Sequence, residues 1–305
     1  MSDFVLKHKK RWARKSKEDK IFDAINLLLI TTITLVVLYP LYFVVIASIS
    51  NPDYVYNGQV WFWPRDITFE GYQRIFQDER IWTGYKNTIV YTIVGTFVNV
   101  VLTLMAAYAL SRKDLVGRNF FMMLFVFTMF FSGGLIPTYL VVKNLGMVNT
   151  MWALIIPKAV AVWNLIVART FFQSTIPDEL LESAQMDGCS NTKFFLKIVL
   201  PLSKPIIAVM VLFYAVGHWN AFFDALIYLN DEERYPLQLI LRSILIQNEA
   251  SANMVGDVES FAAQQRISDL IKYGVIIVAA VPLLILYPFI QKYFVKGALI
   301  GSIKG

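Results

Sequence analysis

The chain of 305 residues is 57% hydrophobic and 15% aromatic, yet only 16% of its residues are charged. Soluble domains usually carry about 25% charged residues, so this composition predicts a polytopic membrane protein. The single cysteine, Cys189, excludes an intramolecular disulfide and a cysteine zinc cluster. The two histidines, His8 and His218, are too few for a histidine-rich metal site, so we expect no metal centre.

The N-terminal segment combines basic residues with a long apolar stretch. Residues 1–20 hold eight lysine and arginine side chains, and residues 21–49 are largely apolar. A signal peptide begins in a similar way, but its apolar region is shorter and ends in an A-x-A cleavage site, which is missing here. We therefore expect an uncleaved first transmembrane helix.

A spanning helix needs about 20 mainly apolar residues. Six segments meet this requirement, so the sequence predicts an all-α fold with six transmembrane helices: 22–48, 86–111, 119–142, 151–172, 202–227 and 271–294. Ser132-Gly133-Gly134 interrupts the third segment and Pro157 interrupts the fourth. Such breaks are tolerated where neighbouring helices or a water-filled path satisfy the freed backbone groups.

The distribution of basic residues predicts the orientation in the membrane. With the N-terminus inside, eighteen of the 28 lysine and arginine residues fall on the inner side, while the outer segments collect acidic residues. Both termini are then cytoplasmic, and the net charge of +6 reflects topology rather than nucleic-acid binding. The predicted domains are a basic tail over 1–21, a permease domain over 22–294 and a C-terminal tail over 295–305.

The polar insert over 177–200 has the pattern of a helical hairpin on the inner side. Pro177 suits the first position of a helix, and the acidic residues after it complement the positive helix N-terminus. Gly188 can adopt the positive φ that ends such a helix, and Ser190 or Asn191 can cap a second one. Pro201 then resets the chain before the fifth span. From these residues alone, the hairpin either anchors the loop at the membrane surface or has a functional role.

The pattern Glu182-x-Ala184-x-x-x-Gly188, followed by Ile198-x-Leu200-Pro201, resembles the EAA motif of ABC importer permeases. Ser183 stands where that motif usually has a second alanine. The similarity extends over almost the whole chain, including GMVNT at 146–150, Trp219-Asn220 and the closing KGALIGSIKG. These segments are similar to the MalG-like permeases of oligosaccharide importers, and the basic N-terminus and FVKG ending look like their Gram-positive branch.

The resemblance implies the type I ABC importer (MetI-like) permease fold, in which the hairpin is a coupling helix that docks in a groove of an ATPase subunit. Glu182 would contact the ATPase, Ala184 would permit close approach, and Gly188 would form the turn. The implied ATPase-coupling residues are Glu182, Ser183, Ala184, Asp187, Gly188, Ile198, Leu200 and Pro201.

The implied partners are a second homologous permease, two ATPase subunits that carry ATP and Mg²⁺, and an extracellular solute-binding lipoprotein that delivers an oligosaccharide. The implied location is a bacterial, Gram-positive cell membrane. The chain contains no Gly-Lys pair and hence no P-loop. Gly188-Cys189-Ser190 resembles a nucleophile elbow, but its final glycine is missing. We therefore expect a transport subunit with no enzyme activity and no cofactor of its own.

Two alternatives stay open. The same permease fold serves importers of other solutes, such as peptides. An ion-coupled secondary transporter or a polytopic membrane enzyme would need intramembrane charges or catalytic groups, and the six predicted spans hold few. A second permease gene and a lipoprotein gene beside this one would favour the importer.

Aromatic rings and amides suit sugar binding, so the candidate substrate path comprises Trp219, Asn220, Phe223, Asp224, Trp163 and Asn164. For Asp224 an interfacial, water-capped acid is the simpler interpretation, and for Trp163 and Asn164 ordinary helix packing is an equal alternative. We expect His218 to be a satisfied polar residue. The outer loop over 230–269 contains a helical apolar stripe that begins at Leu237, and it is either solvated decoration or a docking surface for the binding protein.

Overall fold

The computed structural model describes residues 16–254, 266, 268, 270–285, 287 and 288. These residues are almost entirely helical, and their one isolated β-bridge joins Ser50 to Ile67. The chain divides into two compact units: residues 1–72 with 255–277, and residues 73–254 with 278–305.

The first unit is built around α2 (Lys17–Ser48) and α3 (Pro52–Tyr56). A capping box fixes the start of α2, since the Ser16 side chain accepts from the Asp19 amide and the Asp19 carboxylate accepts from the Ser16 amide. The helix therefore begins five residues before the predicted span at 22. Its apolar side chains are mostly exposed, as expected for a helix that faces lipid.

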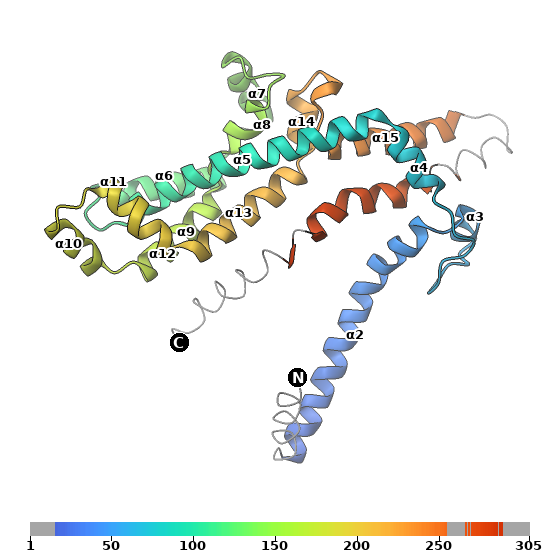
Figure 1. The fold of residues 1–305 in the computed structure, drawn as a ribbon, viewed down its shortest axis with the longest axis horizontal. Coiled ribbons are helices and arrows are strands. Elements are labelled where there is room, and N and C mark those ends of the chain that lie inside the picture. The colour runs from blue at the N-terminus through green and yellow to red at the C-terminus, as the bar shows by residue number, and fades with distance from the viewer. Residues whose placement is uncertain (1–15, 255–265, 267, 269, 286, 289–305) are drawn as a thin grey trace. The chain divides into compact units, whose positions relative to one another are not determined.

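The second unit contains most of the remaining helices, which Figure 1 colours from teal to orange, and α4 begins just before it. They are α4 (Glu70–Gln77), α5 (Glu79–Ser111), α6 (Arg118–Phe130), α7 (Leu135–Asn144), α8 (Trp152–Ile155), η1 (Ile156–Lys158), α9 (Val162–Thr175), α10 (Asp178–Met186), α11 (Asn191–Phe194), η2 (Phe195–Val199), α12 (Leu200–Leu202), α13 (Lys204–Trp219), α14 (Phe223–Tyr228), η3 (Glu232–Arg234) and α15 (Leu237–Met254). A further apolar helix, Leu270–Ile285, comes later in the chain, and its residues up to Ile277 belong to the first unit.

Helix α5 is the central element of this unit, because α9, α13 and α15 all pack against it. Its N-terminus is capped by Asp78, whose side chain accepts from the Arg80 amide. This cap starts the helix seven residues before the predicted span at 86. With 33 residues, α5 is about 50 Å long. The hairpin lies near the C-terminal end of α5, and α15 lies against the N-terminal half of α5.

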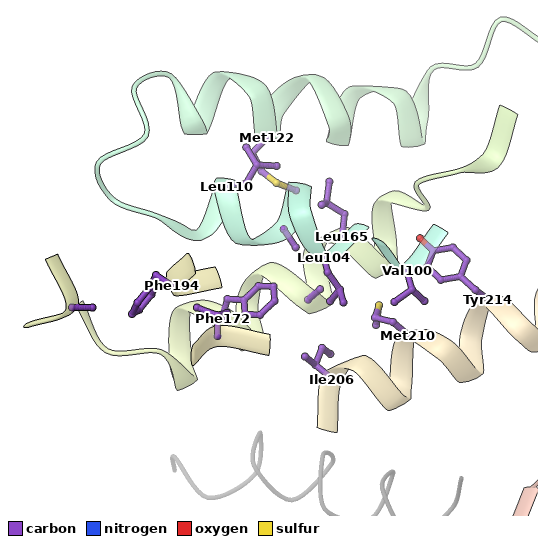
Figure 2. Close-up of a cluster of buried hydrophobic side chains, with 14 residues drawn as sticks. Val100, Leu104, Leu110, Met122, Leu165, Phe172, Phe194, Ile206, Met210 and Tyr214 are labelled. Carbon is purple, nitrogen blue, oxygen red and sulfur yellow. The ribbon is translucent and has the colours of Figure 1, made fainter. Parts of the chain in front are cut away.

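A cluster of buried apolar side chains joins α5, α6, α9, α11 and α13 (Figure 2). Phe172 and Phe194 are almost completely buried, as are Leu165 and Met210. The cluster reaches from the hairpin, through Phe194, to the middle of α13, through Tyr214. The hairpin is therefore packed into the same core as the long helices.

The helical architecture is confirmed among the described residues, whereas the expected number of six spans stays a prediction. Two helices, α2 and α5, are long and apolar enough to cross a membrane, and three bent helix pairs raise the candidates to five among the described residues. The third predicted span bends by 116° between α6 and α7, where Ser132-Gly133-Gly134 lies, and the fourth bends by 53° just after Pro157. Residues 286 and 289–294 of the sixth predicted span, and the tail over 295–305, lie outside the described residues.

The predicted fifth span at 202–227 is not one helix. Helix α13 ends at Trp219, and α14 is a separate short helix. At the other end, the chain bends by 83° between α12 and α13 at Ser203. The sequence stays apolar through both breaks, so hydrophobicity alone predicts one continuous segment where the structure has α12, α13 and α14.

The apolar stripe in the outer loop belongs to α15 and is buried. Leu237, Ile240, Leu241 and Ile244 are each less than 8% exposed, and the helix packs on α5. The Leu237 amide donates to Thr88 Oγ1 at 2.8 Å. The stripe is therefore neither solvated decoration nor an open docking surface, because it attaches the loop to the unit's own central helix.

Candidate functional site

The hairpin begins with a regular helix start and ends α10 with a defined turn. Pro177 is the N-cap residue, one position before the expected one. The Gly188 amide donates to the Gln185 carbonyl and the Cys189 amide donates to the Ala184 carbonyl, each at 2.9 Å. This pair of bonds is a Schellman motif, and it requires the left-handed φ of +71° found at Gly188. The expected role of Gly188 as the turn residue is confirmed.

The second half of the hairpin is capped by Ser190, whose side chain accepts from the Lys193 amide at 3.4 Å. Of the two expected caps, Ser190 is the one used. The helix then passes through a π-helical turn over Phe195–Val199, a feature often found at functional positions.

The expected coupling residues fall into two groups. Glu182, Ser183, Asp187, Gly188 and Pro201 are exposed, while Ile198 and Leu200 are half-buried and Ala184 is 8% exposed. Ser183 Oγ donates to the Glu179 carbonyl of its own helix at 2.8 Å. Ala184 belongs to the buried cluster, so its small side chain allows close approach within the hairpin itself.

Two polar links join the hairpin to the turn after α5. The Arg112 guanidinium donates to Asn191 Oδ1 at 2.8 Å, and Lys113 Nζ lies 2.5 Å from Asp178 Oδ2. The hydrogen bond with Asp178 raises the pKa of Lys113. Arg112 also binds Asp114, and this hydrogen bond lowers the pKa of the Asp114 carboxyl. A hollow of about 350 Å³ lies between these elements.

A second hollow, of about 400 Å³, lies between α5, the break from η1 to α9, α13 and α14. Its lining combines amides, one ion pair and aromatic rings: Asn99, Leu154, Lys158, Ala161, Asn164, Phe213, Tyr214, Gly217, His218, Asn220, Ala221, Phe222, Phe223 and Asp224. We call it the polar pocket. A mostly apolar cavity of this size with a few polar groups is typical of a small-molecule site, since such sites have about 300–1,000 Å³.

The charged pair of the polar pocket is Lys158 and Asp224. Lys158 Nζ donates to both carboxylate oxygens of Asp224, at 2.9 and 2.7 Å. The Asp224 side chain is 18% exposed and that of Lys158 is 69% exposed. Asp224 thus has a protein partner, which replaces the expectation of an acid capped by water alone.

The floor of the polar pocket is a network of buried polar groups on α5 and α13. Asn99 Nδ2 lies 3.3 Å from His218 Nε2, which supports the expectation that His218 is a satisfied polar residue. The Tyr214 hydroxyl lies 2.6 Å from Thr103 Oγ1 and accepts from the Ala161 amide at 3.0 Å. Tyr214 therefore holds the start of α9 against α5 and α13.

Four of the six candidate path residues line the polar pocket: Asn164, Asn220, Phe223 and Asp224. Trp219 does not, because it is 5% exposed and its indole N–H donates to the Ala279 carbonyl at 3.0 Å. Trp163 is 62% exposed and also lies outside the lining. The sequence reasoning missed Lys158, although a lysine within an apolar span is itself a functional signal.

Among the described residues there is no group of three or more metal-ligating side chains. The chemistry present in both hollows is hydrogen bonding, ion pairing and aromatic contact. Such groups bind and orient a molecule or a partner protein.

Known proteins share this sequence and fold over nearly their full length. The chain is 43% identical to the polygalacturonan/rhamnogalacturonan transport system permease protein YtcP of Bacillus subtilis (strain 168), over 94% of this chain and 100% of the relative. It is 41% identical to protein LplC of the same organism, over 95% of this chain and 97% of the relative.

A solved structure gives the same picture. The crystal structure of a bacterial ABC transporter involved in the import of the acidic polysaccharide alginate contains a chain with a TM-score of 0.80 and 33% identity. The match covers 92% of this chain and 99% of that one. Residues 12–300 match the model of binding-protein-dependent transport system inner membrane components. The protein is therefore a multi-pass inner-membrane permease that belongs to this family of binding-protein-dependent transport components.

Proposed function

We propose that this chain is one of two homologous permease subunits of a type I ABC importer and that it moves an oligosaccharide by alternating access. The hairpin is the observation that carries this proposal. It presents an exposed Glu182 on a short helix, while its Ala184 and Phe194 are buried in the core of the long helices. A partner that pushes on the exposed face thereby acts on the long helices.

The hairpin is stiff enough to transmit such a push. Its turn is closed by the Schellman bonds, its second helix is capped by Ser190, and Arg112 ties it to the end of α5. In the proposed mechanism two ATPase subunits, which hold ATP and Mg²⁺, close on each other and displace the hairpins of both permeases. The long helices then move as levers and expose the polar pocket to alternate sides.

The proposed topology follows from the same mechanism. The ATPases are cytoplasmic, so the hairpin, the basic tail over 1–21 and the tail over 295–305 are placed on the cytoplasmic side, with six spans between the termini. An extracellular solute-binding protein delivers the substrate from the other side. The hairpin residues Glu182, Ser183, Asp187 and Gly188 form the coupling surface.

The proposed substrate is a carbohydrate. The relative at 43% identity is named for polygalacturonan and rhamnogalacturonan transport, and the matching crystal structure belongs to an alginate importer. The polar pocket supports the same class, because amides bind sugar hydroxyls and aromatic faces pack against sugar rings. Asn164, Asn220 and Phe223 supply these groups.

Reconstitution tests the proposal. The complete complex, with its sister permease, ATPases and binding protein, is placed in vesicles that contain ATP, and uptake of labelled oligosaccharides is measured. We expect uptake to require ATP and the binding protein and to stop when the ATPase Walker lysine is replaced. Uptake driven by an ion gradient without ATP would contradict the importer and indicate a secondary transporter.

A further inference from the structure

We propose that the polar pocket recognises the carboxylate of a uronic-acid residue and that Lys158 is the specificity-determining cation. This inference rests on the proposed function, because it narrows the carbohydrate to an acidic oligosaccharide. It assigns a role to a residue that the hairpin mechanism does not use.

Lys158 is placed to meet a ligand in the pocket. It is the last residue of η1, directly before the break that leads to α9. Its side chain is 69% exposed, so the ammonium group reaches into the hollow rather than into the protein core. A lysine ammonium has three donors, and its only charged partner among the described residues is Asp224.

The start of α9 adds to the positive character of this position. Ala161, the N-cap residue of α9, and Asn164 in its first turn both line the pocket. The first amides of a helix have no partner within the helix, and the helix dipole favours a negative charge there. Discontinuous helices in transporters place such ends at anionic groups of the substrate.

A buried acceptor in the same pocket is still unpaired. Asn99 is 2% exposed, and its Oδ1 has no hydrogen-bond partner among the described residues. A buried polar atom without a partner is costly, and a sugar hydroxyl would satisfy it once the Asn99 amide turns toward the hollow. A ligand that carries both hydroxyls and a carboxylate matches two features of the pocket: the unpaired Asn99 Oδ1, and a Lys158 ammonium with a third donor that its two hydrogen bonds to Asp224 do not use.

Asp224 gives the pocket the weak binding that transport requires. It neutralises Lys158 and holds the ammonium in place through two hydrogen bonds. An incoming carboxylate competes with Asp224 for the same donors, so the ligand binds and also leaves, as a permeation site demands. Removing the Asp224 charge should therefore strengthen the binding of an acidic sugar.

The named substrates of the relatives have the required chemistry. Polygalacturonan is a polymer of uronic acid, and alginate is described as an acidic polysaccharide. Because each sugar unit of such a polymer carries a carboxylate, every unit that passes through the pocket would bring one carboxylate to Lys158.

The test compares two probes in the reconstituted importer: trigalacturonate and its neutral, carboxyl-reduced counterpart. We expect Lys158→Gln to lower trigalacturonate uptake at subsaturating concentration by about tenfold or more, since a charge-assisted hydrogen bond is lost. Lys158→Arg should retain most of the uptake because it keeps the charge. Lys143→Gln, an exposed lysine on α7, is the matched control and should match the wild type.

Asp224→Asn is the decisive second variant. It tests the inference even where the Lys158→Gln permease fails to assemble into the importer complex. It should lower the half-saturating concentration for trigalacturonate relative to that for the neutral sugar. Equal losses of trigalacturonate uptake in Lys158→Gln and Asp224→Asn would overturn the inference, because the ion pair would then be only structural. A wild type that imports only the neutral sugar would overturn it too. A wild type that imports neither sugar would instead contradict the proposed carbohydrate function.

Discussion

Arg112, the first residue after α5, donates a hydrogen bond of 2.8 Å to the side chain of Asn191, the first residue of α11. The Arg112 side chain is 12% exposed, whereas Asn191 is exposed, so water reaches the bond from the Asn191 side. It connects the longest helix of the second unit directly to the hairpin. Loss of this connection should loosen the hairpin without removing any exposed surface group from it.

We predict that Arg112→Gln weakens coupling. A charge-assisted hydrogen bond contributes about 1.5–3 kcal/mol, and its loss should lower transport per ATP hydrolysed. The neighbouring variant Lys113→Gln is the control, because its ion pair with Asp178 is exposed on both sides and water and salt screen such pairs. The measurement is the ratio of sugar uptake to ATP hydrolysis in vesicles. Equal ratios in Arg112→Gln and Lys113→Gln would remove the link from the mechanism.

The turn at Gly188 allows a test of hairpin geometry. A Cβ atom at this position would meet nothing within 4 Å, so a substitution is limited by the backbone φ of +71° alone. Gly188→Val should therefore cost about 1–2 kcal/mol of left-handed strain and reduce co-purification of the ATPase. Asparagine tolerates this conformation, so Gly188→Asn should retain more of the ATPase than Gly188→Val. A Gly188→Val complex that matches the wild type in ATPase content would show that the turn geometry is not needed.

Close packing between α5 and α13 depends on Gly95. A Cβ atom there would lie 2.5 Å from His218 Nε2, so Gly95→Ala must displace the imidazole that contacts Asn99. We expect a loss of about 1–3 kcal/mol, as for other overpacked sites, measured as a lower melting temperature of the purified complex. Gly217→Ala on α13 is the control, because its Cβ would meet nothing within 4 Å and alanine is the better helix former. A melting temperature of Gly95→Ala equal to that of Gly217→Ala would contradict this packing argument.

Local sequence signals predicted the hairpin well. The turn at Gly188, the cap at Ser190 and the break at Ser132-Gly133-Gly134 each depend on a few adjacent residues. Helices α2 and α5 begin before the apolar segments at 22 and 86, because the caps at Ser16 and Asp78 start each helix with polar residues. Hydrophobicity alone does not mark such helix starts, whereas capping side chains do.

The polar pocket was harder to predict because its residues are distant in sequence. Lys158 and Asp224 are 66 positions apart, and neither flanking sequence indicates the other. Trp219 was predicted to line the substrate path because its amphipathic ring suits a sugar, but its N–H donates to the Ala279 carbonyl in the interior. Side-chain direction on a nearly all-apolar helix cannot be read from periodicity, because no polar face marks the orientation.

The proposed orientation predicts opposite labelling of two introduced cysteines. In a Cys189→Ser background, Gln247→Cys on α15 and Lys193→Cys on α11 both place the thiol at an exposed position. A membrane-impermeant maleimide applied to intact cells should label position 247 and should label position 193 only after the cells are opened. Labelling of position 193 in intact cells would place the hairpin outside and refute its contact with an ATPase.

Glu182 provides the most direct test of the hairpin as a coupling surface. Its carboxylate is exposed on α10 and has no hydrogen-bond or ion-pair partner in the part of the chain that the structure describes. Glu182→Ala should therefore leave the melting temperature of the isolated permease unchanged, since alanine is a good helix former and no contact within the chain is lost.

The expected defect of Glu182→Ala appears only with the partner. If the carboxylate binds the ATPase, its loss should weaken association by about 1.5–3 kcal/mol, seen as reduced co-purification and slower uptake in vesicles. Gln185→Ala, at another exposed position of the same helix, is the matched control and should keep more of both activities. Wild-type ATPase content and uptake in Glu182→Ala would mean that the hairpin only anchors the loop, because a coupling surface that binds the ATPase through this carboxylate cannot lose it without an effect on the bound partner.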